Sequence, residues 1–321
     1  MSEDKPVLVS GIKPTGDLHI GNYFGAMRQL VDLSKTGKYR PFIFVADYHA
    51  LNTMQDAEEM RRRTRELVMA YVAVGLDPKE VVLFKQSHVP AHTELAWIFD
   101  TITTMPYLMR AHAFKDAEAK SKEISVGTFN YPMLMAADIL LYDAAVVPVG
   151  QDQKQHIEYA RDTADKFNRT FKSEVFKLPE PYIMPDVAIV PGTDGQKMSK
   201  SYGNVIPLFA SRDELAKAVM SIVTDSSALV PTNVYAIHKL VRSETELTPL
   251  YIHGPNHGNY KAMKESLIED LDNYFKDMRA KYEELKNNPS IVEEVLEAGK
   301  REARAITEAK MEQVRKAVGV S

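Results

Sequence analysis

A strand, a turn rich in glycine and proline, and a helix follow one another within residues 7–36, and this order constrains the fold most. Val7-Leu8-Val9 is a short, mostly β-branched run that predicts a buried strand, and Pro14 and Gly16 mark the turn after it. Apolar residues then recur at helical spacing, at Ile20, Phe24, Met27, Leu30, Val31 and Leu33. A helix that begins after such a turn points its backbone N–H groups and its positive end at one place, which suits a phosphate.

Three side chains at the start of this helix are candidates for binding a nucleotide. His19 can donate to a phosphate oxygen, Gly21 allows a flat base to approach the backbone, and Asn22 adds a neutral donor and acceptor. An ordinary turn between a strand and a helix, whose glycines only permit tight packing, explains the same residues equally well. This stretch alone therefore leaves both interpretations open.

Strands and helices alternate over the first two thirds of the chain. Apolar runs predict further strands at residues 41–47, 81–84 and 145–149, and helices at 56–74, 91–103 and 151–168. Such alternation predicts a parallel sheet with helices on both faces, and right-handed crossovers make it a Rossmann-like layer of the α/β class. We predict a catalytic domain at residues 1–204, in which ligands bind at the carboxyl ends of the strands.

The remaining segments have a different character. Periodicity is poor at residues 105–130, which predicts an insertion, and only helices are expected in a second domain at residues 205–321. Ser211 and Glu214 form a capping-box pattern for a helix to residue 223, and a single apolar stripe predicts a long helix over residues 260–285. We expect Ser290 and Glu293 to cap a last helix that runs to about residue 318. The only tryptophan, Trp97, is predicted to pack in the core.

Composition narrows the class of protein. The chain has 321 residues, of which 45% are hydrophobic and 26% are charged, as in soluble globular proteins. No apolar run approaches the roughly 20 residues that a membrane span needs, and the polar N-terminus is not a signal peptide. The absence of cysteine excludes disulfides and thiolate metal sites, so a cytoplasmic location is expected. The net charge of -4 neither favours nor excludes a local RNA-binding patch.

A second motif completes a recognisable pair. Lys197-Met198-Ser199-Lys200-Ser201, together with the pattern P-x-G-x-x-H-I-G-N at residues 14–22, resembles the two signatures of class I aminoacyl-tRNA synthetases. The segments LMAADILLY at residues 134–142 and VPVGQDQKQH at 147–156 resemble those of the tryptophanyl-tRNA synthetase family. The likeness is clear over residues 1–225, and the helical remainder matches in general character only.

The resemblance implies two steps, in which ATP and tryptophan form tryptophanyl-adenylate and pyrophosphate and the acyl group then moves to the 3′ adenosine of tRNA(Trp). The first step needs positive charge on the triphosphate rather than a side-chain nucleophile. The implied catalytic residues are Lys197, Lys200 and His19. The implied ATP-binding residues are Lys13, Pro14, Thr15, Gly21, Asn22, Gly150, Gln151, Asp152, Lys197, Met198, Ser199, Lys200 and Ser201. Mg²⁺ is expected on the phosphates, held mostly by ATP oxygens and water, with no dedicated protein metal site.

The resemblance also makes Asp138 the specificity residue. The indole N–H is only a donor, so a carboxylate acceptor in an apolar pocket would select it. The implied tryptophan-binding residues are Asp138, Tyr131, Met135, Gln153, His49, Val9, Val147 and Val149. A satisfied core histidine is an equally good interpretation of His49 on chemistry alone, and His156 is expected to be a structural partner.

Three positions depart from the commonest bacterial pattern, because Lys13 replaces glutamine, Gln151 replaces glutamate and Val9 replaces a larger aromatic residue. The resemblance further implies a homodimer through the segment at 105–130 and tRNA binding by the C-terminal helices. The candidate cations there, which could also be a solvated face, are Arg301, Arg304, Lys310, Arg315 and Lys316.

Three other functions share parts of this pattern. Tyrosyl-tRNA synthetases have the same fold and mechanism, and an aspartate also accepts from a phenol. A sensor that binds tRNA or tryptophan without charging is disfavoured by the presence of His19, Lys197 and Lys200. Small-molecule adenylyltransferases are similar only in the nucleotide-binding half and lack a helical domain.

Overall fold

The computed structural model describes residues 5–14, 16–119, 123–149, 154–183, 189–224, 230–253 and 258–321. Its centre is a five-stranded parallel sheet in the order β3-β2-β1-β4-β5. The strands are β1 (Val7–Ile12), β2 (Arg40–Val45), β3 (Val82–Lys85), β4 (Val146–Val149) and β5 (Glu180–Ile183). This order confirms the predicted α/β, Rossmann-like fold.

The register of the strands puts their carboxyl ends at one edge of the sheet. Ile12, the last residue of β1, pairs with Val45, the last residue of β2, and Val45 in turn pairs with Lys85 at the end of β3. The chain order reverses between β1 and β4, which are neighbours in the sheet. A crevice at this reversal is where open parallel sheets bind ligands.

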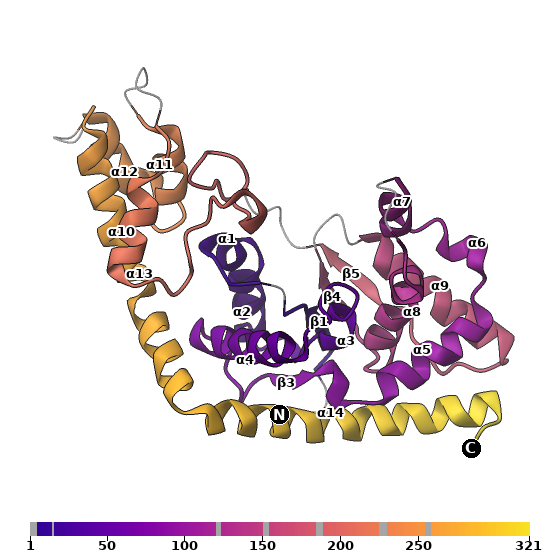
Figure 1. Ribbon diagram of the computed structural model, residues 1–321. Coiled ribbons are helices and arrows are strands. Elements are labelled where there is room, and N and C mark those ends of the chain that lie inside the picture. Colours follow the sequence, from indigo (N-terminus) through magenta and orange to yellow (C-terminus); the bar gives the residue numbers. More distant parts are fainter. Residues whose placement is uncertain are drawn as a thin grey trace.

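Helices cover both faces of the sheet (Figure 1). The helix after β1 runs without interruption through α1 (Ile20–Asn22), the π-helical η1 (Tyr23–Met27) and α2 (Arg28–Lys35). The other helices of this part are α3 (Asp47–Ala50), α4 (Ala57–Ala73), η2 (Gln86–His88), α5 (Ala91–Ile102), α6 (Met105–Leu108), α7 (His112–Ala119), α8 (Val126–Leu140) and α9 (Lys154–Thr170). Those that match predicted helices do so within a few residues.

Each face of the sheet has its own hydrophobic core, because alternate strand residues point to opposite sides. Leu8 and Ile43 pack on one side with η1, α2 and α4, and this core continues into the C-terminal helices. Val9, Phe42 and Phe84 pack on the other side with α5, α8 and α9. The predicted division at residue 204 remains a prediction, since the first core joins residues from both sides of it.

The C-terminal part is helical, as expected. It contains η4 (Lys200–Tyr202), α10 (Arg212–Met220), α11 (Thr232–His238), α12 (Glu244–Thr248), η5 (Pro249–His253), α13 (Tyr260–Asn287) and α14 (Pro289–Val318). The capping box of Ser211 and Glu214 is present at α10. The predicted stripe is also confirmed, because Met263, Leu267 and Leu271 of α13 are fully buried.

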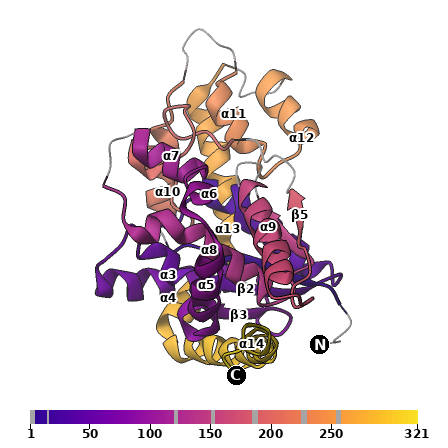
Figure 2. The ribbon, with the colours of Figure 1, turned by 90° about the vertical axis from the view of Figure 1, so that its right-hand side faces the viewer.

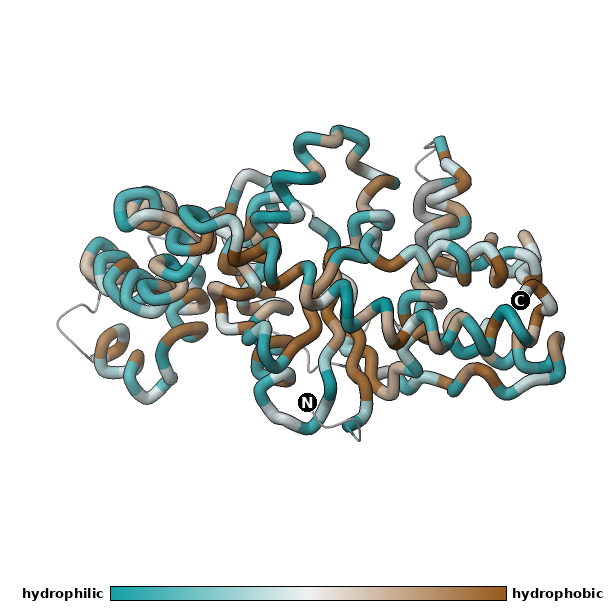
Figure 3. Tube along the Cα trace, turned by 90° about the horizontal axis from the view of Figure 1, so that it is seen from below, coloured by the Kyte–Doolittle hydropathy of each residue, from teal (hydrophilic) through white to brown (hydrophobic). Residues whose placement is uncertain are grey.

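Helix α14 crosses beneath the sheet and lies along β3 (Figures 1 and 2). Hydrophobic and hydrophilic residues alternate along it in the view from below (Figure 3), as in an amphipathic helix with one buried side. The predicted cap at Ser290 is wrong, because Asn288 precedes the first turn and Pro289 is its first residue. Proline suits that position, since its missing N–H would have no partner there.

Three of the five cations proposed on α14 instead attach this helix to the rest of the protein. Arg304 Nε donates to the His88 carbonyl at 2.6 Å, and Lys310 Nζ pairs with Asp143 Oδ1 at 2.8 Å. Arg315 makes a two-pronged pair with Glu94 at 2.7 and 2.8 Å. The charges of Lys310 and Arg315 are thus paired with carboxylates, whereas Arg304 bonds a neutral carbonyl and is exposed, as are Arg301 and Lys316. The expected binding of tRNA by this helix stays a prediction.

Other details differ from the sequence-based expectations. Strand β5 was not predicted, because it has only four residues and a proline at its second position, which is typical of an edge. Residues 105–130 contain α6, α7 and the start of α8, and residues 46–47 leave β2 to begin α3. Trp97 is 70% exposed, so its predicted place in the core is wrong. None of the described helices is long and apolar enough to cross a membrane.

The contact between α14 and β3 gives a test of the fold. A Cβ on Gly299 would lie 2.0 Å from the backbone oxygen of Leu83, so Gly299→Ala must push the helix off the strand. We expect the free energy of unfolding to fall by about 1–3 kcal/mol, although alanine favours helices. Chemical denaturation measures the effect. The exposed neighbour is the control, since Ala298→Gly should cost only about 1 kcal/mol of helix propensity. A stabilised Gly299→Ala variant would contradict this packing.

Candidate active site

Backbone hydrogen bonds join the two sequence signatures directly. Ile20 N donates to the Ile206 carbonyl at 3.0 Å, and Leu208 N donates to the Leu18 carbonyl at 3.0 Å. We call this pair of bonds the clasp. Residues 206–208 follow the K-M-S-K-S segment, so the clasp fixes that segment beside the turn after β1. The two motifs therefore lie side by side.

The K-M-S-K-S segment is anchored by its middle residue and exposes its lysines. Met198 is only 4% exposed, and a Cβ on Gly21 would lie 3.3 Å from Met198 Cβ. Lys197 and Lys200 are exposed on either side of it. Ser199 and Ser201 share a hydrogen bond of 2.9 Å between their hydroxyls. The segment is therefore held at its centre while both of its lysines remain exposed.

Asn204, which the sequence analysis did not single out, holds the loop in shape. Its Nδ2 donates to Asp194 Oδ1 at 2.6 Å and to the Lys197 carbonyl at 3.1 Å, and its Oδ1 accepts from Ser199 N at 2.8 Å. The residue is 2% exposed. A side-chain amide with both donor and acceptor is required for this set of bonds. An asparagine three residues past the motif was the available signal.

Cationic groups gather at the turn. A Cβ on Gly16, which has a positive φ of 69°, would lie 2.1 Å from Lys200 Nζ and 3.1 Å from Arg63 Nη1. Partial burial lowers the pKa of Lys200, and the nearby Asp17 opposes that shift. Partial burial also lowers the pKa of Lys13. An anion bound near these two ammonium groups would oppose this lowering of their pKa, because a negative charge stabilises the charged form.

The histidine of the first motif is neutral near pH 7. Burial, reinforced by the charge of Lys200, lowers the pKa of His19 to about 4. Its Nδ1 is buried and has no hydrogen-bond partner in the described part of the chain. The Asn22 side chain accepts from His19 N at 3.0 Å, which orders the first turn of the helix. Pro14 is buried and the predicted Thr15 lies outside the described residues.

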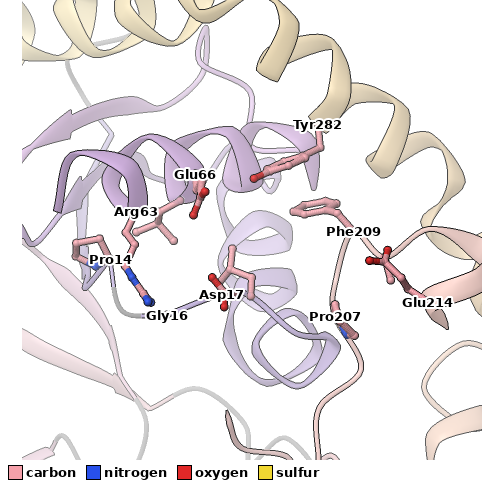
Figure 4. Close-up of a pocket in the computed structure, with 12 residues that line it drawn as sticks. Pro14, Gly16, Asp17, Arg63, Glu66, Pro207, Phe209, Glu214 and Tyr282 are labelled. Carbon is pink, nitrogen blue, oxygen red and sulfur yellow. The ribbon is translucent and has the colours of Figure 1, made fainter. Parts of the chain in front are cut away.

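A cavity adjoins this turn (Figure 4). Arg63 extends from α4 toward Gly16, and Glu66 and Asp17 line the same space. Phe209 and Tyr282 close one side as a stacked pair, with ring centroids 4.1 Å apart. Arg63 is held from behind by an ion pair with Glu59. The sequence analysis did not identify Arg63, because it lies in an arginine-rich helix far from either motif.

A second cluster surrounds Asp138 of α8, which is only 2% exposed. Oδ1 accepts from Gln86 Nε2 at 2.7 Å and from His92 Nδ1 at 2.6 Å, and Oδ2 accepts from His49 Nε2 at 2.8 Å. Burial raises the pKa of Asp138, but the hydrogen bonds from His49 and His92 outweigh it and bring the pKa to about 2. The carboxylate is therefore charged at neutral pH, and three donors compensate its burial.

Gln86 and His92 were missed, although both follow β3 closely in the sequence. Gln86 is the first residue after β3 and is fully buried, as is His92 in the first turn of α5. His92 Nε2 bonds the Tyr142 hydroxyl at 2.9 Å. Nothing in the local pattern links them to Asp138, because the cluster is assembled only when α5 and α8 pack together.

Apolar and aromatic side chains border this cluster. Val9, Val147 and Val149 are buried in the core on the α8 side of the sheet, and Met135 packs against it. The ring of Tyr131 lies edge-on to His49, with centroids 6.2 Å apart, and its hydroxyl bonds His156 Nε2 at 2.5 Å. The last contact agrees with the expected structural role of His156. Gly150, Gln151, Asp152 and Gln153 lie outside the described residues.

Among the described residues, no group of three or more histidine, aspartate or glutamate side chains is arranged to hold a metal ion. The site thus presents an electropositive, partly buried place at the switch point of the sheet and a buried anionic acceptor beside an apolar wall. Such an arrangement is that of a nucleotide-binding α/β protein.

Comparison with known proteins identifies the family. The family model described as tRNA synthetases class I (W and Y) matches residues 1–297, and the chain belongs to this family. It is 48% identical over 320 residues to the tryptophan–tRNA ligase of Fusobacterium nucleatum, covering 97% of both chains. It is 43% identical to that of Campylobacter jejuni, covering 98% of this chain and 99% of the relative.

A solved structure has the same fold. The tryptophanyl-tRNA synthetase from Campylobacter jejuni, complexed with ADP and tryptophan, superposes with a TM-score of 0.90 at 44% identity. The match covers 97% of this chain and 99% of that chain. The suspected family resemblance is thereby confirmed.

The depressed pKa of His19 predicts an acid-dependent loss of stability. The unfolded chain binds this proton near pH 6.5 and the folded protein near pH 4, so the contribution is complete above pH 6.5 and is lost as the pH falls toward 4. We expect His19→Gln to lose less free energy of unfolding than wild type between pH 7.5 and 5. Denaturant titrations at both pH values measure it. His88→Gln is a useful comparison, because burial also lowers the pKa of His88 to about 4. If His19→Gln and wild type lost the same free energy of unfolding between the two pH values, the prediction would be contradicted.

Proposed function

We propose that this protein is an ATP-dependent tryptophan–tRNA ligase. It joins the carboxylate of L-tryptophan to the α-phosphorus of ATP, releases pyrophosphate, and transfers the acyl group to the 3′ adenosine of tRNA(Trp). The observation that carries the proposal is the buried, charged Asp138 beside an apolar wall, on the same edge of the sheet as the two clasped signatures. Family membership and 48% identity to a tryptophan–tRNA ligase support it.

The nucleotide is proposed to lie along the turn after β1. The positive end of the helix beginning at Ile20, with Lys13, Lys200 and the more distant Lys197, would neutralise the triphosphate as charge moves toward the leaving pyrophosphate. Neutral His19 would donate or accept a hydrogen bond there without adding charge. The remaining proposed ATP contacts are Pro14, Thr15, Gly21, Asn22, Gly150, Gln151, Asp152, Met198, Ser199 and Ser201. Mg²⁺ would accompany the phosphates, held mainly by their oxygens and by water.

The amino acid is proposed to lie against β1 and α8. Asp138 Oδ2 has only His49 as a partner among the described residues, so it retains an acceptor position for the indole N–H. Val9, Val147, Val149 and Met135 would contact the ring, and Tyr131, Gln153 and His49 its polar end. A phenol could also use Asp138, but the identity to tryptophan–tRNA ligases favours tryptophan over tyrosine.

The tRNA is proposed to bind the C-terminal helices. Arg301 and Lys316 stay exposed on α14, and the cavity-lining Arg63 adds a cation nearer the nucleotide. ATP and tRNA are cytoplasmic substrates, which supports the expected cytoplasmic location.

Pyrophosphate exchange into ATP, with each amino acid in turn, tests the function. We expect exchange with tryptophan alone. Asp138→Asn should raise the KM for tryptophan by about tenfold or more, because a charged acceptor is lost, and leave the KM for ATP nearly unchanged. Lys200→Ala should instead lower kcat by about 10²-fold, because transition-state charge is no longer stabilised. Exchange with tyrosine would place the protein with the tyrosine enzymes, and tryptophan binding without exchange would favour a sensor.

We further propose a homodimer formed by a face that comprises α5, α6, the start of α8 and the C-terminal end of α3. Large apolar side chains on this face are exposed, namely Leu51 at 48%, Trp97 at 70%, Met105 at 66%, Met109 at 45% and Val126 at 76%. Asn130 bonds Asp100 at 2.9 Å and Asn52 bonds the Gly127 carbonyl at 3.3 Å, so these elements are held on one side (Figure 2). An exposed apolar face of this kind is typical of a protein interface.

A charge at the centre of this face should separate the subunits. We expect Trp97→Glu to shift the protein from dimer to monomer in sedimentation velocity, because a buried glutamate without a partner is costly. Val320→Glu, at an equally exposed valine near the C-terminus, is the control and should stay dimeric. A dimeric Trp97→Glu variant would show that this face is not the interface.

A further inference from the structure

The two carboxylate oxygens of Asp138 differ in their hydrogen bonds. Within the described part of the chain, Oδ1 accepts two hydrogen bonds, from Gln86 of η2 and His92 of α5, whereas Oδ2 accepts one, from His49 of α3. A carboxylate oxygen has about two lone-pair sites. Oδ1 is therefore fully used in holding the carboxylate, and only Oδ2 can accept from a ligand.

The proton positions around His92 follow from its partners. A carboxylate only accepts, so Nδ1 of His92 carries the hydrogen that Asp138 receives. Nε2 can then accept from the hydroxyl of Tyr142, which reaches only His92 among the hydrogen bonds of the described residues. A proton on Nε2 would leave the buried Tyr142 hydrogen without an acceptor. The geometry thus favours a proton on Nδ1 and leaves Nε2 as the acceptor.

The environment of this chain of bonds is aromatic. The rings of Phe44 and Phe84 lie 5.7 and 6.3 Å from His92, and Phe42 lies 5.2 Å from Tyr142. His92 is fully buried and Tyr142 is 2% exposed. Removing a donor here exposes the charge of Asp138 to an apolar interior, which favours the protonated form. A protonated Asp138 would lose the charge-assisted bond to an indole N–H.

We propose that His92 and Tyr142 are positioning residues for tryptophan selection, and that they act through Asp138 by keeping its carboxylate charged with Oδ2 directed at the substrate. This inference rests on the proposed role of Asp138. Neither side chain needs to touch the substrate. Of the residues that the structure describes, the titratable groups that face Asp138 are His49, His92 and Tyr142, and Gln86 is a further polar partner.

The test compares His92→Leu, His92→Asn and Tyr142→Phe with wild type in pyrophosphate exchange from pH 5.5 to 8.5. The substrates are tryptophan and β-(3-benzothienyl)alanine, which has a similar shape but sulfur in place of the indole N–H. His92→Leu should lower kcat/KM for tryptophan by about tenfold or more and spare the sulfur analogue, so that the ratio between them falls. The KM for ATP should stay within about twofold.

The dependence of kcat/KM on pH is a second measurement, which a purely structural role of His92 would not change. In wild type, Asp138 stays charged over this range, since its pKa is about 2. In His92→Leu the pKa of Asp138 should rise, so kcat/KM for tryptophan should fall as the pH is lowered. His92→Asn keeps an N–H donor near the position of Nδ1 and should restore both the ratio and the profile. Tyr142→Phe should give a smaller change, of about threefold, in the same direction.

Asp138→Asn in the same assay distinguishes the proposed role of Asp138 from the proposed positioning by His92 and Tyr142. If Asp138→Asn leaves the ratio of the two substrates unchanged, the role of Asp138 itself is wrong. If Asp138→Asn lowers the ratio while His92→Leu and Tyr142→Phe keep the wild-type ratio and profile, only the proposal on positioning is overturned. Should His92→Leu fail to fold, the nearly isosteric Tyr142→Phe decides the question by the same criteria.

Discussion

A carboxylate that stays charged in an apolar interior depends on its hydrogen-bond donors, and the substrate edge of this sheet is built to supply them. Asp138 comes from α8, and its donors come from α3, η2 and α5. Two of these elements follow the carboxyl ends of β2 and β3 directly. The buried charge therefore sets how four elements meet, because a shift of any one would leave a charge or a donor unsatisfied.

The nucleotide end of the site carries positive charge, in contrast to the negative charge of Asp138. Burial lowers the pKa of both Lys13 and Lys200, and His19 remains neutral near Lys200. The cations repel one another and are partly buried. A bound phosphate would compensate both effects, because its negative charge stabilises the charged ammonium groups. The protein thus places positive charge at the turn and a hydrogen-bonded negative charge at α8. The proposed reaction needs both, since a triphosphate and an indole require opposite partners.

Short local patterns were enough to recognise the two signatures and to predict the parallel sheet and the long helix α13. Each of these depends on residues that are close in sequence. The cluster of Gln86, His92, Asp138 and Tyr142 could not be predicted in this way, since its members come from η2, α5 and the C-terminal end of α8 and meet only when these elements pack together. Strand β5 is too short and too rich in proline for a periodic signal. The cations of α14 show a further limit, because charge on a helix does not reveal whether its partner is solvent, RNA or the same chain.

The clasp between residues 18–20 and 206–208 consists only of main-chain groups. Side chains at Leu18, Ile20, Ile206 and Leu208 can therefore vary in evolution without removing either bond, provided that the hydrophobic packing is kept. Proline is the exception at the two donor positions, 20 and 208, because it has no N–H. The junction between the two signatures is thus tolerant of most substitutions, and families can diverge widely around it while the two motifs stay in register.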